Sequence, residues 1–166
     1  MTQTEQTVLL VKPEAVRYDQ QVFEQLIAHE FSSIQRIGEA ALEKIDAEDL
    51  ARMLYPDADA ALFKAVHDHF WNQRMSWVIL TAPGAIEKLS RLVGTSADPG
   101  KCMPGTLRAR FFSEDGKQKL LPSVLNDPKT GLNFEYHFNG FLCPRTEEER
   151  DRWFRSGVFY KTARAA

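Results

Sequence analysis

The sequence predicts an α+β sandwich in which helices pack on a central four-stranded antiparallel sheet. Short apolar runs typical of buried strands alternate with segments whose apolar residues recur at helical spacing, and no internal repeat or low-complexity linker interrupts them. The order is strand, helix, strand, helices, strand, helix, loop, strand, helix, which suits ferredoxin-like topology within this class. With 166 residues, we expect one domain spanning residues 1–166.

Composition limits the classes of function that are compatible with the chain. Hydrophobic residues make up 43% and charged residues 27%, with a formal net charge of −2, as in folded soluble proteins. Nucleic acid is an unexpected partner because it would require a basic face, so a few local cations should hold any anionic ligand. The sequence has neither a membrane-length apolar run nor a recognisable signal peptide, which predicts a cytoplasmic protein without membrane contact. Cys102 and Cys143 lie far apart without a metal-ligand pattern, so reduced thiols are expected.

The first part of the chain predicts two strands with a helix between them. Residues 7–11 form an apolar run that ends at Lys12, which predicts a buried strand with this lysine at its C-terminal edge. The apolar face of the following helix is expected to contain Phe23, Leu26, Ile27 and Phe31. Residues 34–45 are compatible with a second strand, in which Gly38 would form a bulge.

Three helices and a third strand are predicted next. Asp46 is expected to cap a helix that runs through Met53, and Asp59 to start another. The apolar face of this second helix carries Leu62, Phe63, Val66 and Phe70. Residues 75–81 predict the third strand, and Pro83-Gly84 turns it into a further helix. This last helix would point Ile86, Leu89 and Val93 inward and end at Gly94.

The final part of the chain is predicted to contain a long loop, a strand and a helix. Residues 95–110 are rich in turn-forming types, and the stretch 113–131 is polar and uneven. Residues 132–138 predict the last strand. The sequence Thr146-Glu-Glu-Glu149 has the form of a capping box, which would open a helix that runs to Trp153-Phe154.

Three motifs in chain order resemble the nucleoside diphosphate kinase family. They are the stretch 7–16 with Lys12-Pro13, the sequence Pro104-Gly105-Thr106-Leu107-Arg108 after Gly94, and His137 followed by an acidic helix that ends in Trp153-Phe154. The resemblance extends from about residue 7 to residue 154, with an extended loop at about 109–132. It implies transfer of the γ-phosphoryl group from a nucleoside triphosphate to a nucleoside diphosphate by a ping-pong mechanism through phosphorylated His137.

The resemblance assigns the catalytic roles to three residues. His137 would carry the phosphoryl group, because imidazole is neutral and nucleophilic near pH 7. Lys12 would assist the transferring group, and Glu149 would orient His137 by accepting its ring N–H. For a histidine taken without its motif, the alternative is a structural residue of the strand.

Further residues are assigned to nucleotide binding. Arg108 would hold the phosphates bidentately, with Arg91 as a second arginine and Ser96 as a phosphate-contacting hydroxyl. For Arg91, a solvated helix face is the alternative.

The remaining assignments concern the nucleoside. Lys12 and Asn133 would bind the ribose hydroxyls, and Tyr55 would lie near the lysine and the histidine. Phe63 would stack on the base, which favours tolerance of different bases. Because Phe63 is also on an apolar helix face, a role in the core is its alternative.

The resemblance also implies partners and a cofactor. Mg²⁺ is expected, held mainly by the nucleotide phosphates rather than by a metal site of the protein. The partners would be nucleoside di- and triphosphates, and a homo-oligomer is expected. After His137, however, the chain has Phe138-Asn139-Gly140 where the family has Gly-Ser-Asp or Ala-Ser. The alternative function is therefore a catalytically weak or inactive nucleotide-binding regulatory module.

Overall fold

The computed structural model describes most of the chain. The described residues are 4–13, 15–41, 44–95, 102–114, 117–118 and 140–158, with the backbone alone for 36–41, 44–46, 65, 69, 112–114 and 117–118. The predicted strand at 132–138 and the candidate site residues Ser96, Asn133 and His137 lie outside them.

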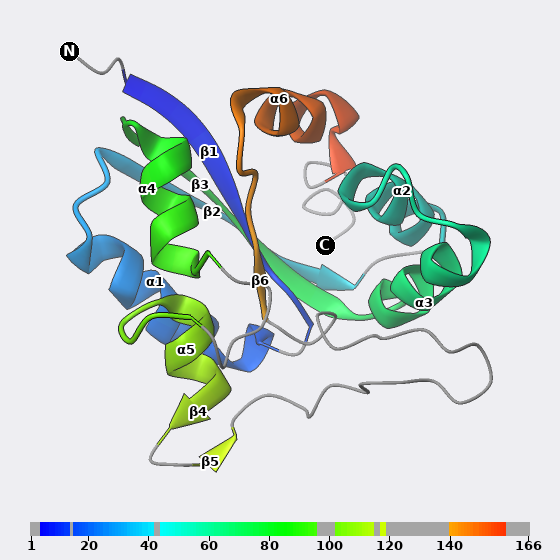
Figure 1. Ribbon diagram of the computed structural model, residues 1–166, viewed down its shortest axis with the longest axis horizontal. Helices are drawn as coiled ribbons and strands as arrows, with labels where there is room; N and C mark the ends of the chain where they lie inside the picture. Colours follow the sequence, from blue (N-terminus) through cyan, green and yellow to red (C-terminus); the bar gives the residue numbers. More distant parts are fainter. Residues whose placement is uncertain are drawn as a thin grey trace.

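A four-stranded antiparallel sheet forms the centre of the fold (Figure 1). Its strands, in spatial order, are β2 (Ser33–Ala41), β3 (Arg74–Pro83), β1 (Thr4–Val11) and β6 (Phe141–Leu142). The central pair extends from Thr4 opposite Pro83 to Val11 opposite Ser76, whereas β6 pairs only with Leu10 and Val11. This order and direction confirm the predicted α+β fold with ferredoxin-like topology.

Helices cover both faces of this sheet (Figure 1). Those associated with one face are α1 (Asp19–Ala28), α4 (Ala85–Val93) and α5 (Leu107–Phe112), and those on the other are α2 (Lys44–Leu54), α3 (Ala60–Phe70) and α6 (Glu147–Ser156). A 3₁₀ turn, η1 (Val16–Tyr18), precedes α1, and the short strands β4 (Ser113–Glu114) and β5 (Lys117–Gln118) pair after α5.

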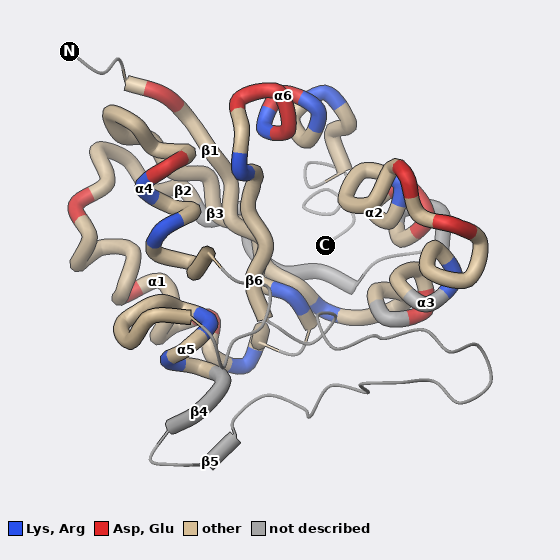
Figure 2. Tube along the Cα trace, in the orientation of Figure 1, with Lys and Arg blue, Asp and Glu red and all other residues tan. Residues whose placement is uncertain are grey.

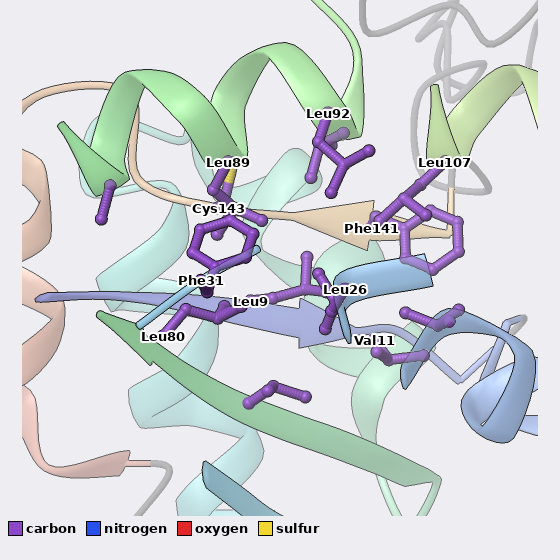
Figure 3. Close-up of a cluster of buried hydrophobic side chains, with 14 of the residues drawn as sticks. Leu9, Val11, Leu26, Phe31, Leu80, Leu89, Leu92, Leu107, Phe141 and Cys143 are labelled. Atoms are coloured by element: carbon purple, nitrogen blue, oxygen red, sulfur yellow. The ribbon is translucent and has the colours of Figure 1, made fainter. Parts of the chain in front are cut away.

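The inner parts of the two central strands, Val8–Val11 of β1 and Trp77–Leu80 of β3, are apolar because both of their faces are buried. Successive side chains of a strand point to opposite faces. Leu9 and Val11 therefore enter the core under α1, α4 and α5 (Figure 3), while Val8 and Leu10 enter the core under α2, α3 and α6. Burial of each such side chain contributes roughly 1.5–3 kcal/mol.

Several local predictions are confirmed. The β2–β3 register shifts between Arg36 and Gly38, at the predicted bulge. Asp59 caps α3, its Oδ1 accepting from the Leu62 N–H at 2.8 Å, and Thr146 caps α6, its Oγ1 accepting from the Glu149 N–H at 3.1 Å.

The predicted face of α1 is wrong in part. Ile27 was expected inside but is 55% exposed, and Val22 is buried in its place together with Leu26. Val22 and Leu26 are four residues apart and share one face, whereas Ile27 lies about 100° further around the helix. The helix ends at Ala28, so Phe31 reaches the core from the connection to β2.

Other predicted boundaries also differ from the structure. The second strand ends at Ala41 rather than 45, and α2 begins at Lys44, which places Asp46 inside the first turn instead of at the cap. The turn-rich stretch gives way to a helix at Leu107, because the Thr106 hydroxyl accepts from the Ala109 N–H at 3.3 Å and so caps α5. The predicted loop at 109–132 therefore starts with helical residues.

Candidate functional site

Two of the predicted site residues each contact the short segment where β6 begins. Antiparallel pairing sets Val11 opposite Phe141, and the next residue, Lys12, donates its backbone N–H to the Gly140 carbonyl at 2.9 Å. Arg108, from the first turn of α5, donates through Nη2 to the Phe141 carbonyl at 2.7 Å. Lys12 from the end of β1, 1% exposed, and Arg108 from α5, 2% exposed, therefore contact the same short segment, Lys12 through its backbone and Arg108 through its side chain.

The Arg108 guanidinium is buried and is affected by a second positive charge, that of Arg145. Burial, and then the positive charge of Arg145, lowers the pKa of Arg108 to about 10. The group therefore remains protonated at neutral pH. Because a charge in a poorly solvated place interacts more strongly than one in water, Arg108 is suited to hold an anion.

Arg145 also belongs to this site, although the sequence did not predict it. Its Nη1 donates to Ser90 Oγ at 2.6 Å, and its Nη2 donates to the Gly94 carbonyl at 2.8 Å. Arg108 Nη1 reaches the same Gly94 carbonyl at 3.4 Å. The only sequence signal available was its position directly before the α6 cap, which gives no indication of a contact with α4.

Tyr55 and Phe63 belong to the α2 and α3 layer. Tyr55 follows α2 and packs against the core under α2, α3 and α6. Phe63 is half-buried against the same core, and its ring stacks near His67, with centroids 6.5 Å apart. The Arg52 guanidinium lies over the Phe63 ring at 5.5 Å from the centroid. Phe63 therefore combines a packing role with a ring that already attracts a planar cation.

The Arg91 side chain lies on the exposed surface of α4. Its side chain is 75% exposed and pairs with Glu87 one turn earlier on α4 at 2.6 Å. It also lines an open depression of about 700 Å³ together with Lys88 and Thr106. In this structure the Arg91 guanidinium is therefore paired with a carboxylate on the exposed surface of α4, beside the depression that Thr106 also lines.

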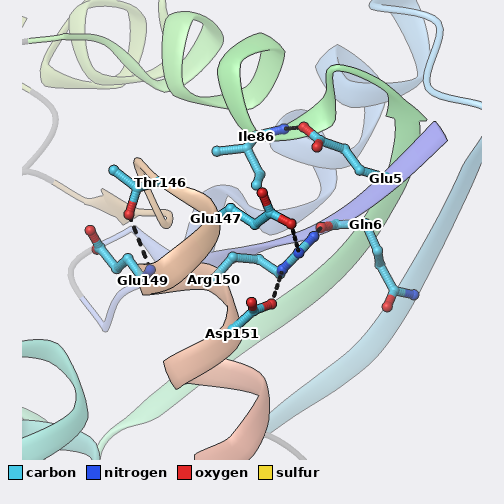
Figure 4. Close-up of polar contacts among 8 residues, drawn as sticks. All are labelled: Glu5, Gln6, Ile86, Thr146, Glu147, Glu149, Arg150 and Asp151. Atoms are coloured by element: carbon cyan, nitrogen blue, oxygen red, sulfur yellow. Dashed lines mark hydrogen bonds and ion pairs between the residues drawn. The ribbon is translucent and has the colours of Figure 1, made fainter. Parts of the chain in front are cut away.

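Glu149 is half-buried in the acidic first turn of α6 (Figure 2). Burial raises the pKa of the Cys143 thiol, Arg145 and Arg108 oppose this shift, and the negative charge of Glu149 adds to it. The helix is anchored to β1 by Arg150, which donates to the Gln6 carbonyl at 2.7 Å and also pairs with Asp151 at 2.7 Å (Figure 4). This contact sets the position of Glu149 relative to the sheet.

Comparison with known proteins places the chain in a family. A family model described as nucleoside diphosphate kinase matches residues 5–121. The chain belongs to the nucleoside diphosphate kinase family. The nucleoside diphosphate kinase of Bordetella petrii is 31% identical over 107 residues, which cover 64% of this chain and 74% of that protein.

Solved structures of the same family share the fold. A nucleoside diphosphate kinase from Borrelia burgdorferi, a transition-state mimic with bound vanadate and ADP, has a TM-score of 0.64 at 18% identity, over 92% of this chain and 86% of that one. The enzyme from Aquifex aeolicus has a TM-score of 0.67 at 16% identity, over 95% of each chain.

The family match includes only part of the predicted site. It covers the positions of Lys12, Tyr55, Phe63, Arg91, Ser96 and Arg108 and ends before those of Asn133, His137 and Glu149. Family membership therefore rests on the part of the chain that supplies the buried cations.

None of the described helices is both long and apolar enough to span a membrane. In the same part of the chain, no group of three or more histidine, cysteine or carboxylate side chains is arranged to hold a metal ion.

Proposed function

We propose that this protein transfers the γ-phosphoryl group from a nucleoside triphosphate to a nucleoside diphosphate through phosphorylated His137. The observation that carries this proposal is the pair of buried cations, Lys12 and Arg108, at the start of β6 in a chain of the nucleoside diphosphate kinase family. Phosphoryl transfer depends mainly on positioning and on stabilisation of charge on the phosphate oxygens. Buried cations provide both.

His137 is connected to these cations by a short piece of chain. It precedes Gly140 by three residues, and three residues span at most about 11 Å even when fully extended. Gly140 accepts the backbone bond from Lys12. We infer that a phosphoryl group on His137 would be formed close enough for Lys12 and Arg108 to contact it.

The other assigned residues complete the proposed cycle. Glu149 accepts the ring N–H of His137 and leaves the second ring nitrogen free to attack. Lys12 and Asn133 bind the ribose, Phe63 stacks on the base with Tyr55 nearby, and Ser96 contacts phosphate. Arg91 would contribute only after releasing Glu87, so its role is the smallest of the set.

Mg²⁺ fits the donor set as an ion held by the substrate. Lys12 and Arg108 are cations that bind phosphate oxygens, and the hard oxygen ligands that Mg²⁺ prefers would come from the nucleotide. When bound, the ion neutralises adjacent phosphates. We further propose a single cytoplasmic domain that forms homo-oligomers, and a mass measurement in solution would establish the oligomeric state.

A labelling experiment tests the activity. Incubation with γ-labelled ATP and Mg²⁺ is expected to give acid-labile, base-stable phosphate on wild-type protein and on His29→Gln, but not on His137→Gln. His29 is exposed, so its variant is a matched control. The label should then move to several nucleoside diphosphates. Wild-type protein that binds ADP but takes no label would contradict the proposal.

The cation Arg108 can be tested separately. Arg108→Gln is expected to slow phosphorylation by two to three decades, since each decade corresponds to ~1.4 kcal/mol of lost transition-state stabilisation. Circular dichroism should first establish that the variant is folded, because Arg108 also bonds two backbone carbonyls. A folded variant with the wild-type rate would remove Arg108 from the mechanism.

A further inference from the structure

We propose that Arg145 is a positioning residue of the phosphate site: it holds the Gly94 carbonyl that Arg108 also contacts, and it adds a second positive charge beside Arg108. This inference rests on the proposed function, because it assigns the anion at this place to the phosphates of a nucleoside diphosphate.

The geometry connects three elements that are far apart in the sequence. From the turn before α6, Arg145 donates to Ser90 Oγ at 2.6 Å, to the Ser90 carbonyl at 3.3 Å and to the Gly94 carbonyl at 2.8 Å. Both carbonyls belong to the C-terminal end of α4, where a cation is favoured by the helix dipole. Arg108 approaches the Gly94 carbonyl from α5 at 3.4 Å.

Capping of the C-terminal end of α4 does not by itself explain why the positive charge of Arg145 lies near that of Arg108. Arg145 brings a second guanidinium to a carbonyl already contacted by the buried Arg108, and like charges in a poorly solvated place repel. The more exposed Arg52 and Arg91 are neutralised by carboxylates on their own helices, at 2.9 Å and 2.6 Å. Among the residues that the structure describes, Arg145 contacts oxygen atoms of Ser90 and Gly94 but no carboxylate. An anionic ligand would supply the missing negative charge.

The electrostatic coupling of the two arginines supports this assignment. The charge of Arg145 lowers the pKa of Arg108, second only to the effect of burial. A phosphate group bound beside Arg108 would therefore also be attracted by Arg145, whether or not Arg145 touches it.

The test compares ligands with and without phosphate. Binding of ADP and of adenosine would be measured by titration calorimetry and NMR for wild type, Arg145→Gln and Arg155→Gln. Arg155 is an exposed arginine on α6, so its variant controls for the same loss of charge. Arg145→Gln is expected to weaken ADP binding about tenfold, equal to ~1.4 kcal/mol, while adenosine binding and Arg155→Gln remain within about twofold of wild type.

A purely structural role would weaken both ligands equally, and that result would overturn the proposal. An unchanged ADP affinity in folded Arg145→Gln would overturn it as well. Because binding is measured without turnover, wild-type protein that binds ADP but forms no phosphohistidine would contradict the proposed activity alone.

A milder variant covers the case in which Arg145→Gln does not fold. Ser90→Ala removes the 2.6 Å bond to Arg145 but retains both charges. It is expected to weaken ADP binding roughly two- to fivefold with adenosine unchanged, since one hydrogen bond to a charged group is lost. Wild-type ADP affinity in Ser90→Ala would show that the position of Arg145 is irrelevant to phosphate binding.

Discussion

At the residue scale, Gly94 combines a left-handed backbone conformation, a carbonyl bonded by two arginines and close packing against Cys102. Its φ of +123° lies in a region that side chains rarely adopt, and its carbonyl accepts from both Arg108 and Arg145. A Cβ atom on Gly94 would lie 2.6 Å from Cys102 Sγ. Helix α4 ends at this glycine, as the sequence predicts. The two arginine contacts and the close approach of Cys102 could not be predicted, because they depend on how distant parts of the chain pack together.

Gly94→Ala is expected to destabilise the protein by about 3 kcal/mol, because backbone strain and a steric clash add together. Urea unfolding would measure the loss. Gly157→Ala is the matched control: its φ of +66° is also left-handed, but no atom lies within 4 Å of the added Cβ, so about 1 kcal/mol is expected. Equal losses in the two variants would contradict the clash with Cys102.

Cys143 makes stability depend on pH. Burial raises the pKa of its thiol from 9.0 to about 11, with Arg145 and Arg108 opposing the shift. Between these pH values the unfolded chain releases the thiol proton and the folded protein keeps it. The stabilisation is therefore complete below pH 9 and is lost by about pH 11, at a cost of roughly 3 kcal/mol. Urea unfolding of wild type should weaken more steeply over this range than that of Cys143→Ala, and parallel pH curves would exclude the effect.

At the scale of elements, helix starts were predictable where a capping side chain bonds to its own first turn. Asp59 and Thr146 act through residues three positions later, and both assignments are confirmed. Thr106 caps α5 in the same way, but its signal was obscured by the preceding Pro104-Gly105. Asp46 had the right residue type, yet α2 already begins at Lys44.

Asp59→Ala is expected to cost about 1 kcal/mol because the Leu62 N–H loses its acceptor. Thermal or urea unfolding would measure the change. Asp57→Ala, an exposed acidic residue in the turn before α3, serves as the control and should change stability by less than about 0.5 kcal/mol. If both variants lose the same stability, charge rather than capping is responsible.

At the scale of the whole molecule, β1 and β3 join two hydrophobic cores into one structure. Leu9 lies in the core under α1, α4 and α5, whereas Trp77 and Trp153 lie in the core on the opposite face. Tryptophan fluorescence therefore includes signals from the core that does not contain Leu9. We expect the two cores to unfold together, since each depends on the same strands.

Leu9→Ala is expected to lower stability by about 2–5 kcal/mol and to shift the transitions seen by fluorescence and circular dichroism equally. Urea unfolding followed by both methods would test this. Gln21→Ala, on the exposed face of α1, should leave both transitions within about 0.5 kcal/mol of wild type. A fluorescence transition that stays in place while the dichroism transition shifts would show two independent units.

The sequence alone determined the features that depend on near neighbours in the chain: the apolar strands, the bulge at Gly38, the caps of α3 and α6, and Lys12 at the end of β1. Hydrophobic periodicity and helix capping involve residues close together in the chain, so they can be recognised from the sequence without a structure. Only the tertiary structure decided that Arg91 turns to Glu87 and that Arg145 reaches Ser90, 55 residues away. Contacts of this kind depend on how α4, α5 and α6 pack against the sheet, and that packing cannot be inferred from the spacing of residues in the sequence.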